Sequence, residues 1–245
     1  MRNDSAYGFP YALPFVDFMK RLQLQPRLRL LSELVPDGVR LADIGTDHGY
    51  LPVALLQQGK IKNAIAADIV AAPLQHARNT AEEYGVSDID FRLCDGLAAI
   101  GAEEVDAVVI AGMGGETIVS ILSAAPWVKE KTVFLQPMTK VEYLRQWLGE
   151  NGYVFEKERL VWDKGILYPI LAVHGGEKRE LTAAEQYAGI AFDGDPLYAD
   201  YLTYQIERLQ KAIDGLNRAN DCCSHGRACE FDAIRKALEE KRKML

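Results

Sequence analysis

The sequence predicts an α/β fold, in which helices cover both faces of a mostly parallel seven-stranded sheet, followed by a C-terminal helical, coiled-coil-like appendage. Three observations predict it. Short apolar runs alternate five times with helical patterns over residues 39–150. Two strand-like runs, at 153–162 and 166–174, then follow each other directly, and their Asp163-Lys164-Gly165 connection is typical of an antiparallel hairpin. Beyond residue 200, apolar residues recur at helical spacing.

The individual elements follow from hydrophobic periodicity and from the turn residues between them. An amphipathic helix is expected at 22–35, before Pro36-Asp37-Gly38. The further expected strands are 39–44, 63–68, 89–93, 105–111 and 132–136, and the further expected helices are 51–58, 71–84, 116–124 and 140–150. A terminal hairpin that inserts an antiparallel strand is the order of the Rossmann-like methyltransferase sheet, whereas a dinucleotide dehydrogenase usually continues with parallel units.

Three parts are expected along the chain: an irregular N-terminal extension at 1–19, a methyltransferase domain that binds the methyl donor at 20–176 and a helical domain at 177–245. The boundary before the helical domain is placed at Gly175-Gly176. A polar break is expected at 217–229, between the two helices of an antiparallel pair. The apolar seam of the pair is expected to comprise Leu202, Ile206, Leu209, Ile213, Leu216, Ile234, Leu238 and Leu245.

Composition and charge limit the classes of function. Hydrophobic residues make up 49% of the chain, which supports a packed core. No apolar run reaches the roughly 20 residues that a membrane helix needs, and Pro10 and Pro14 interrupt the N-terminal apolar stretch. A cytoplasmic protein with no membrane contact is therefore expected. The net charge of −7 disfavours nonspecific coating of nucleic acid, although residues 20–40 and 235–245 each hold a local excess of basic residues.

The cysteines are expected to be free thiols, because nothing in the sequence indicates secretion. Cys222, Cys223, His225 and Cys229 cluster near one loop, yet adjacent cysteines do not match the paired spacing of zinc sites. No metal is expected, although a zinc site at this cluster is the alternative.

The candidate cofactor loop begins with Asp43 and Gly45, at the end of the first predicted strand. Gly49 follows at a G-x-x-x-G spacing, with Asp47 and His48 between the glycines. A dinucleotide fingerprint needs G-x-G-x-x-G, so that a pyrophosphate can approach the backbone. The Asp47 carboxylate would repel a pyrophosphate and would tolerate a sulfonium cation beside an ammonium group. The loop therefore favours S-adenosyl-L-methionine.

Two further carboxylates follow later strands. Asp68, with its neighbour Ile69, ends the second strand, and its carboxylate is suited to the two hydroxyls of a ribose. Asp95, with its neighbour Gly96, follows the third strand and is suited to the exocyclic amine of adenine. A single aspartate after a strand is also common as a turn or helix cap. Three aspartates at matching strand ends, all at the ligand-binding edge of the sheet, favour a methyl-donor site over three separate caps.

The fourth predicted strand ends in Ala111-Gly112-Met113-Gly114-Gly115. Many amino-methylating enzymes have prolines and an aromatic residue here, which clamp an exocyclic amine. The small residues of this chain leave room for a flat ring, and Met113 is expected to pack on it. A tight strand–helix turn without a binding role is the alternative.

Four motifs together resemble the bacterial tRNA (adenine(22)-N1)-methyltransferases. They are Leu41 to Pro52, Cys94 to Leu97, Ile110 to Gly115 and Leu135 to Pro137. The resemblance runs from near Arg27 to about His174, and Met138 stands where relatives are expected to carry asparagine. It implies transfer of a methyl group from S-adenosyl-L-methionine to N1 of an adenine at position 22 of tRNA. A monomer with no obligatory protein partner is expected.

The implied chemistry assigns roles to the loop. Adenine N1 attacks without prior deprotonation, and the product ring stays cationic until a proton leaves N6. Asp47 is expected to be the catalytic carboxylate that stabilises this charge or takes the proton, with His48 also catalytic and Tyr50 in support. Arg27 is expected to hold the carboxylate of the donor by a two-pronged contact, and an exposed helix arginine is the alternative.

Other functions stay open from the residues alone. The same site would also serve methylation of another RNA or of a heteroaromatic small molecule. A non-catalytic module that binds the donor or RNA is the alternative from outside the enzymes. For a tRNA substrate, the helical domain and the basic stretches are expected to contact phosphates.

Overall fold

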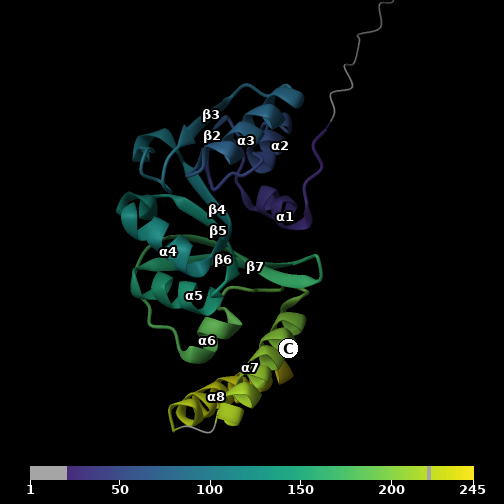
Figure 1. Cartoon of the computed structure of the whole chain (residues 1–245), viewed down its shortest axis with the longest axis vertical. Helices are drawn as coiled ribbons and strands as arrows, with labels where there is room; N and C mark the ends of the chain where they lie inside the picture. The colour runs from purple at the N-terminus through teal and green to yellow at the C-terminus, as the bar shows by residue number, and fades with distance from the viewer. Residues whose placement is uncertain (1–20, 220–221) are drawn as a thin grey trace, which may run out of the picture.

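Seven strands form one mixed sheet in the computed structural model, which describes residues 21–219 and 222–245. Their order is β3-β2-β1-β4-β5-β7-β6, and β7 is antiparallel to both of its neighbours (Figure 1). The strands are β1 (Arg40–Ile44), β2 (Asn63–Asp68), β3 (Ile89–Leu93), β4 (Ala107–Gly114), β5 (Thr132–Thr139), β6 (Tyr153–Asp163) and β7 (Ile166–Gly175). The predicted fold class is confirmed. The predicted extension at 1–19 lies outside the described residues.

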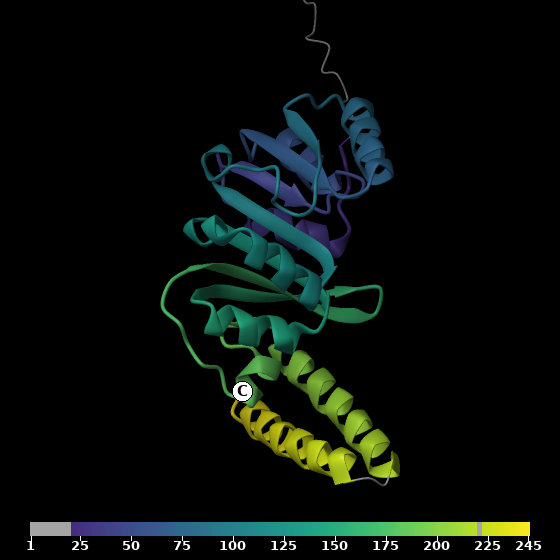
Figure 2. The ribbon, with the colours of Figure 1, turned by 60° about the vertical axis from the view of Figure 1, so that its left-hand side comes forward.

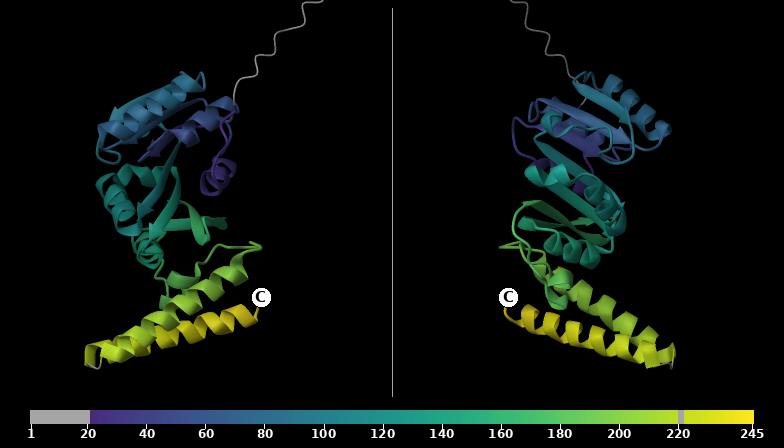
Figure 3. Two further views of the ribbon diagram at one scale, coloured as in Figure 1. Left: turned by 45° about the vertical axis from the view of Figure 1, so that its right-hand side comes forward. Right: turned by 90° about the vertical axis from the view of Figure 1, so that its left-hand side faces the viewer.

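Helices cover both faces of the sheet, as Figure 3 shows from two sides. They are α1 (Pro26–Leu34), α2 (Tyr50–Gln57), α3 (Ala71–Glu83), α4 (Gly115–Ala124) and α5 (Val141–Glu150), with short 3-10 turns η1 (Ala102–Glu104) and η2 (Pro126–Glu130). Alternate residues of a strand point to opposite faces. In β4, Val108 and Ile110 join the core under α4 and α5, whereas Val109 joins the core under α1 and α2.

The first helix begins later than its hydrophobic pattern suggests. The prediction started it at residue 22, but α1 begins at Pro26, and Gln25 before it is extended. Proline favours the first position of a helix and forces its predecessor out of the helical region, which explains the shift. The backbone N–H of Leu22 instead donates to Oε1 of Gln57 at 3.0 Å.

The C-terminal part is helical, with α6 (Ala183–Ala188), α7 (Tyr198–Ala219) and α8 (Cys222–Lys243). The last two form the predicted antiparallel pair (Figure 2), and Nη1 of Arg242 near the end of α8 donates to Oγ1 of Thr203 near the start of α7. Leu202, Leu209 and Leu238 form their core. None of the described helices is long and apolar enough to cross a membrane.

Two expectations about this pair were wrong. The polar break predicted at 217–229 is helical wherever the structure describes it, because polar residues such as His225 and Arg227 lie on the outer surface of α8. Leu245 does not extend the seam, since it lies past the end of α8 and is 68% exposed. The domain boundary at residue 176 stays a prediction.

A buried ion pair links the sheet domain to the C-terminal helices. The guanidinium of Arg145 on α5 donates to Oε2 of Glu158 on β6, from Nε at 2.9 Å and from Nη2 at 2.6 Å. Its Nη1 donates to the carbonyls of Gln186 and Tyr187 and to the hydroxyl of Tyr201 on α7. Both charged side chains are fully buried. The pair therefore fixes α6 and α7 against the edge of the sheet.

Candidate active site

The predicted cofactor loop leaves β1 through three residues with positive φ. Gly45 has φ +70°, Asp47 has φ +51° and Gly49 has φ +66°. The amides of Gly45 and Thr46 both donate to the carbonyl of Ala67 on β2, at 2.8 and 3.1 Å. These bonds fold the loop back over the carboxyl ends of β1 and β2. A left-handed conformation is easy for glycine but costs energy at Asp47, and such cost is commonly found at functional sites.

Asp43, at the end of β1, is hydrogen-bonded to this loop. Its side chain is buried, and Oδ2 accepts a hydrogen bond from Oγ1 of Thr46 at 2.7 Å. Burial raises the pKa of Asp43 to about 6, the bond from Thr46 acts against this rise, and the charge of Asp68 adds to it. A nearby cation would favour the ionised form. The carboxyl group is therefore suited to a site that receives a positively charged ligand.

Two cavities meet at Gly45. The smaller, of about 200 Å³, lies over the ends of β1, β2 and β3, and the larger, of about 500 Å³, lies over the loop and the ends of β4 and β5. A Cβ at Gly45 would stand 2.1 Å from Cε of Met113. The missing side chain thus leaves room for Met113 where the two cavities join.

The smaller cavity brings together six predicted cofactor residues from distant parts of the sequence, Gly45 and Met113 among them. Asp68 and Ile69 line it from the end of β2, and Asp95 and Gly96 line it after β3. Met113 from β4 and Ile121 from α4 add apolar surface. Carboxylates at the rim of an apolar slot are suited to the ribose and adenine of an adenosine group. The residues present therefore fit the adenosine part of S-adenosyl-L-methionine.

The larger cavity holds the predicted catalytic loop. Asp47, His48 and Tyr50 line it, and the side chain of Asp47 is 69% exposed. Oδ1 of Asp47 lies 3.7 Å from Nε2 of His48. Asp47 is therefore an exposed carboxylate at the surface of the cavity, with His48 beside it, rather than the partner of a buried ion pair.

Arg27 reaches the same cavity from α1, as the sequence predicts, but two of its nitrogens already have partners. Nε donates to Oδ2 of Asp163 at 2.5 Å, and Nη1 donates to Oε1 of Gln136 at 2.8 Å. The sulfur of Met138 also accepts from Nη1, at 3.2 Å. Arg27 is thus held in place by the β6–β7 hairpin and β5 and is not the freely exposed helix arginine of the alternative. Its contact with the carboxylate of the donor stays a prediction.

Gly112 forms a bulge in β4, which runs past the end predicted for this strand at residue 111, so the alternative of a tight strand–helix turn is wrong. The strand continues to Gly114, and the register with β5 shifts between Ala111 and Met113. Gly112 has φ +77°, and its N–H donates to Oε1 of Gln136 at 3.2 Å. The pairing with β5 outweighs the weak strand propensity of the two glycines in β4. The bulge leaves backbone rather than side chain facing the larger cavity.

Sequence reasoning missed three residues near the cavity. Gln136, although part of a quoted motif, had no role, yet its Oε1 joins Arg27 to Gly112. Lys164 lines the cavity from the tip of the hairpin. His76 on α3 is stacked on His48, with ring centroids 5.0 Å apart. Only Gln136, the polar residue that ends the predicted strand 132–136, and the turn lysine gave a local signal, because the His76 contact joins segments that the sequence separates.

The cysteine cluster is only partly described, because the side chain of Cys222 lies outside the described part of the chain. Cys223 and Cys229 are exposed free thiols. Among the described residues, no group of three potential ligands stands close enough together to hold a metal ion. The expectation of no metal at this cluster stays a prediction.

The comparisons with known proteins agree with this geometry. Residues 24–171 match the model of a methyltransferase domain. The chain is 32% identical over 218 residues to the tRNA (adenine(22)-N(1))-methyltransferase of Bacillus subtilis strain 168, which covers 83% of this chain and 90% of that protein. The crystal structure of the B. subtilis m1A22 tRNA methyltransferase TrmK matches with a TM-score of 0.78 at 28% identity, over 90% of this chain and 99% of that one.

A third match holds the cofactor. The crystal structure of Streptococcus pneumoniae Sp1610 in complex with S-adenosyl-L-methionine matches with a TM-score of 0.75 at 30% identity. The match covers 86% of this chain and 97% of that one. The matches extend over most of the chain and of the relatives, and the donor loop and both cavities are in place. The chain therefore belongs to the bacterial tRNA (adenine(22)-N(1))-methyltransferase family.

Proposed function

We propose that this protein transfers the methyl group of S-adenosyl-L-methionine to N1 of adenine 22 in tRNA. The observation that carries the proposal is the place of Asp47, an exposed carboxylate beside the junction of an adenosine-sized cavity and a larger open one. The named relative in B. subtilis is a tRNA (adenine(22)-N(1))-methyltransferase. S-adenosyl-L-methionine, when bound, supplies an electrophilic methyl group on a sulfonium cation.

Two groups of residues would contact the two ends of the donor, its adenosine and its methionine part. Asp68 and Asp95 would accept hydrogen bonds from ribose and adenine, while Ile69, Gly96 and Met113 would contact the ring faces. Asp43 and Gly45 would shape the loop beside the sulfonium, and Arg27 would attract the carboxylate of the methionine end. The loop and strand ends thus place opposite charges where the donor carries charge.

The catalytic assignment rests on what the acceptor needs. Adenine N1 attacks with an in-plane lone pair, so no base is required to start the reaction. Methylation leaves a positive charge on the ring, which is discharged when a proton leaves N6. The Asp47 carboxylate would stabilise that charge and receive the proton, and His48 beside it would orient the carboxylate or carry the proton on to water.

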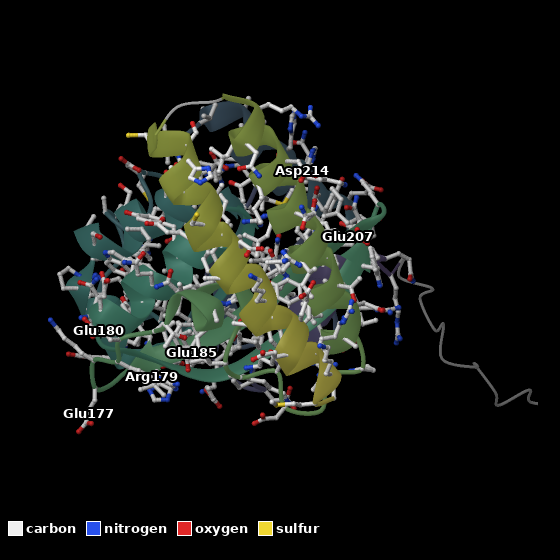
Figure 4. The ribbon with its side chains drawn as sticks, turned by 90° about the horizontal axis from the view of Figure 1, so that it is seen from below. Glu177, Arg179, Glu180, Glu185, Glu207 and Asp214 are labelled. Carbon is white, nitrogen blue, oxygen red and sulfur yellow. The ribbon has the colours of Figure 1, made fainter. Side chains whose placement is uncertain are left out.

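The tRNA-binding surface is proposed to lie around the cavity more than on the basic stretches. Arg40 is paired with Asp106 at 2.7 Å, and Arg235 is paired with Asp232 and Glu239, so much of the positive charge in both stretches is neutralised locally. Exposed acids also stand on the C-terminal side, where Figure 4 labels Glu177, Glu180, Glu207 and Asp214.

We place the activity in the cytoplasm, where tRNA is found, and propose that the protein acts as a monomer.

The proposal is tested with purified protein, methyl-labelled S-adenosyl-L-methionine and unmodified bacterial tRNA. After digestion of the RNA to nucleosides, label is expected in 1-methyladenosine. Label in another nucleoside or in a small heteroaromatic compound would support a different substrate for the same site. Donor binding without transfer to any RNA would support a non-catalytic module and contradict the proposal.

A further inference from the structure

Three rings lie in near-parallel contact beside the catalytic loop. His48 is stacked on Tyr50, with centroids 5.1 Å apart and planes 8° apart, and on His76, with centroids 5.0 Å apart and planes 9° apart. The rings come from three segments: the loop after β1, the first residue of α2 and the middle of α3. We call these three residues the ring row.

The ring row leads from the cavity toward solvent. Tyr50 and His48 line the larger cavity, whereas His76 does not line it and is exposed. A ring stack in the core gains most of its stabilising energy from the apolar surface that it buries, and an exposed stack gains less of it. Here the row is open along part of its length. An open row of flat rings is the surface on which proteins stack unpaired nucleobases.

A free positive charge stands on the same cavity. Lys164 lines it from the β6–β7 turn and has φ +50°, which is unusual for a residue with a side chain. In the described parts of the chain, Lys164 has no ion pair or side-chain hydrogen bond. Arg27, the other strongly basic residue of this cavity, is bound to Asp163. Lys164 is therefore the cation of the cavity that is available to a phosphate.

We propose that His76 and Lys164 are substrate-positioning residues: the ring row stacks the base next to the target adenine, with His76 as its outer ring, and Lys164 binds a phosphate of the same unpaired stretch. This inference rests on the proposed function, since it supposes an RNA substrate. The target adenine must leave its stack before its N1 can reach the donor. Its neighbour then loses a stacking partner, and the ring row replaces that partner.

The test is steady-state methylation of tRNA by His76→Ala, His76→Tyr and Lys164→Ala. Stacking on an aromatic side chain changes binding by about 5-fold to 150-fold per base. His76→Ala is expected to raise the KM for tRNA within that range, with kcat and the KM for the donor unchanged, and His76→Tyr is expected to restore it. Lys164→Ala is expected to raise the KM for tRNA several-fold and to reduce the salt dependence of binding by about one phosphate contact, a slope change of about 0.7.

Two matched controls separate these effects from general damage. Gln75→Ala changes the exposed neighbour of His76 on α3, and Lys157→Ala removes an exposed lysine from the same hairpin. Both are expected to behave like the wild type. Because His76 is exposed, its variants are expected to unfold at the wild-type temperature.

Each contrary result points to one conclusion. If His76→Ala lowers kcat at an unchanged KM for tRNA, His76 merely orients His48 and the stacking role is wrong. An unchanged KM in both alanine variants would overturn the inference while leaving the proposed function intact. A wild-type protein that forms no 1-methyladenosine in any tRNA would overturn the proposed function and, with it, this inference.

Discussion

Replacing Arg145 by leucine is expected to destabilise the protein more than any substitution of a surface arginine. The variant loses both hydrogen bonds to Glu158, of 2.9 and 2.6 Å, and three bonds to α6 and α7. Burial lowers the pKa of Arg145, but the charge of Glu158 and the contact with Tyr201 raise it above its ordinary value, so the arginine is always charged. Leucine would leave the carboxylate of Glu158 buried and without a cation.

The size of the effect follows from that orphaned carboxylate. Removing one partner of a buried ion pair costs about 3–5 kcal/mol. For a chain of this length, each 1 kcal/mol lowers the unfolding temperature by about 2–4 °C, so a fall of about 6–20 °C is expected. Some interaction remains, because Oε1 of Glu158 still accepts from the N–H of Ile190 at 2.8 Å. Denaturant unfolding followed by circular dichroism measures the change in free energy.

Two companion variants make the test specific. Arg145→Leu combined with Glu158→Gln removes the stranded charge but keeps an acceptor for Ile190, so part of the lost stability is expected to return. Arg235→Leu breaks two surface pairs within α8, with Asp232 and Glu239, and is expected to cost about 1 kcal/mol or less. If Arg145→Leu were as stable as Arg235→Leu, the buried pair would not be what holds the C-terminal helices to the sheet.

The remaining predictions concern the donor loop. Because the pKa of Asp43 lies at about 6, raising the pH through 6 ionises it and is expected to tighten binding of the cationic donor; titration calorimetry from pH 5 to 8 should show this, and Asp43→Asn should remove it. Gly45→Ala is expected to weaken donor binding several-fold, since its Cβ would displace the flexible end of Met113 where the two cavities join, whereas Gly59→Ala has open space at a similar φ and should bind normally. Asp47→Asn tolerates the left-handed backbone and removes only the charge, so donor affinity should persist while kcat falls about 100-fold or more; equal kcat would contradict the catalytic role.

The strand–helix alternation could be predicted because each strand is a continuous apolar run between turn residues. The three carboxylates at the strand ends were placed for the same reason: the carboxyl ends of parallel strands meet at one edge, and Asp68 and Asp95 do line one cavity there. The fourth strand was predicted to end at residue 111 because local propensity says nothing of the partner strand that holds Gly112 in β4. Local propensity likewise failed in the first half of α8.

Other features could not be predicted because they join distant segments. The contact between His48 and His76 depends on how α3 packs beside the loop, and the pair of Arg27 and Asp163 joins residues 136 apart in the sequence. Nothing near Arg145 in the sequence indicates that an arginine among apolar neighbours is fully buried. These contacts follow from packing, and they decide which cations remain free for a substrate.

The central claim is methylation of adenine 22, and the most direct measurement compares two unmodified tRNA transcripts that differ only in carrying adenine or guanine at position 22. Reverse transcription stops at 1-methyladenosine, since the methyl group blocks base pairing. After incubation with the protein and S-adenosyl-L-methionine, the adenine transcript should stop at position 22, and the guanine transcript should read through and take up no label. Equal labelling of both transcripts, or a stop at another position, would contradict the assignment.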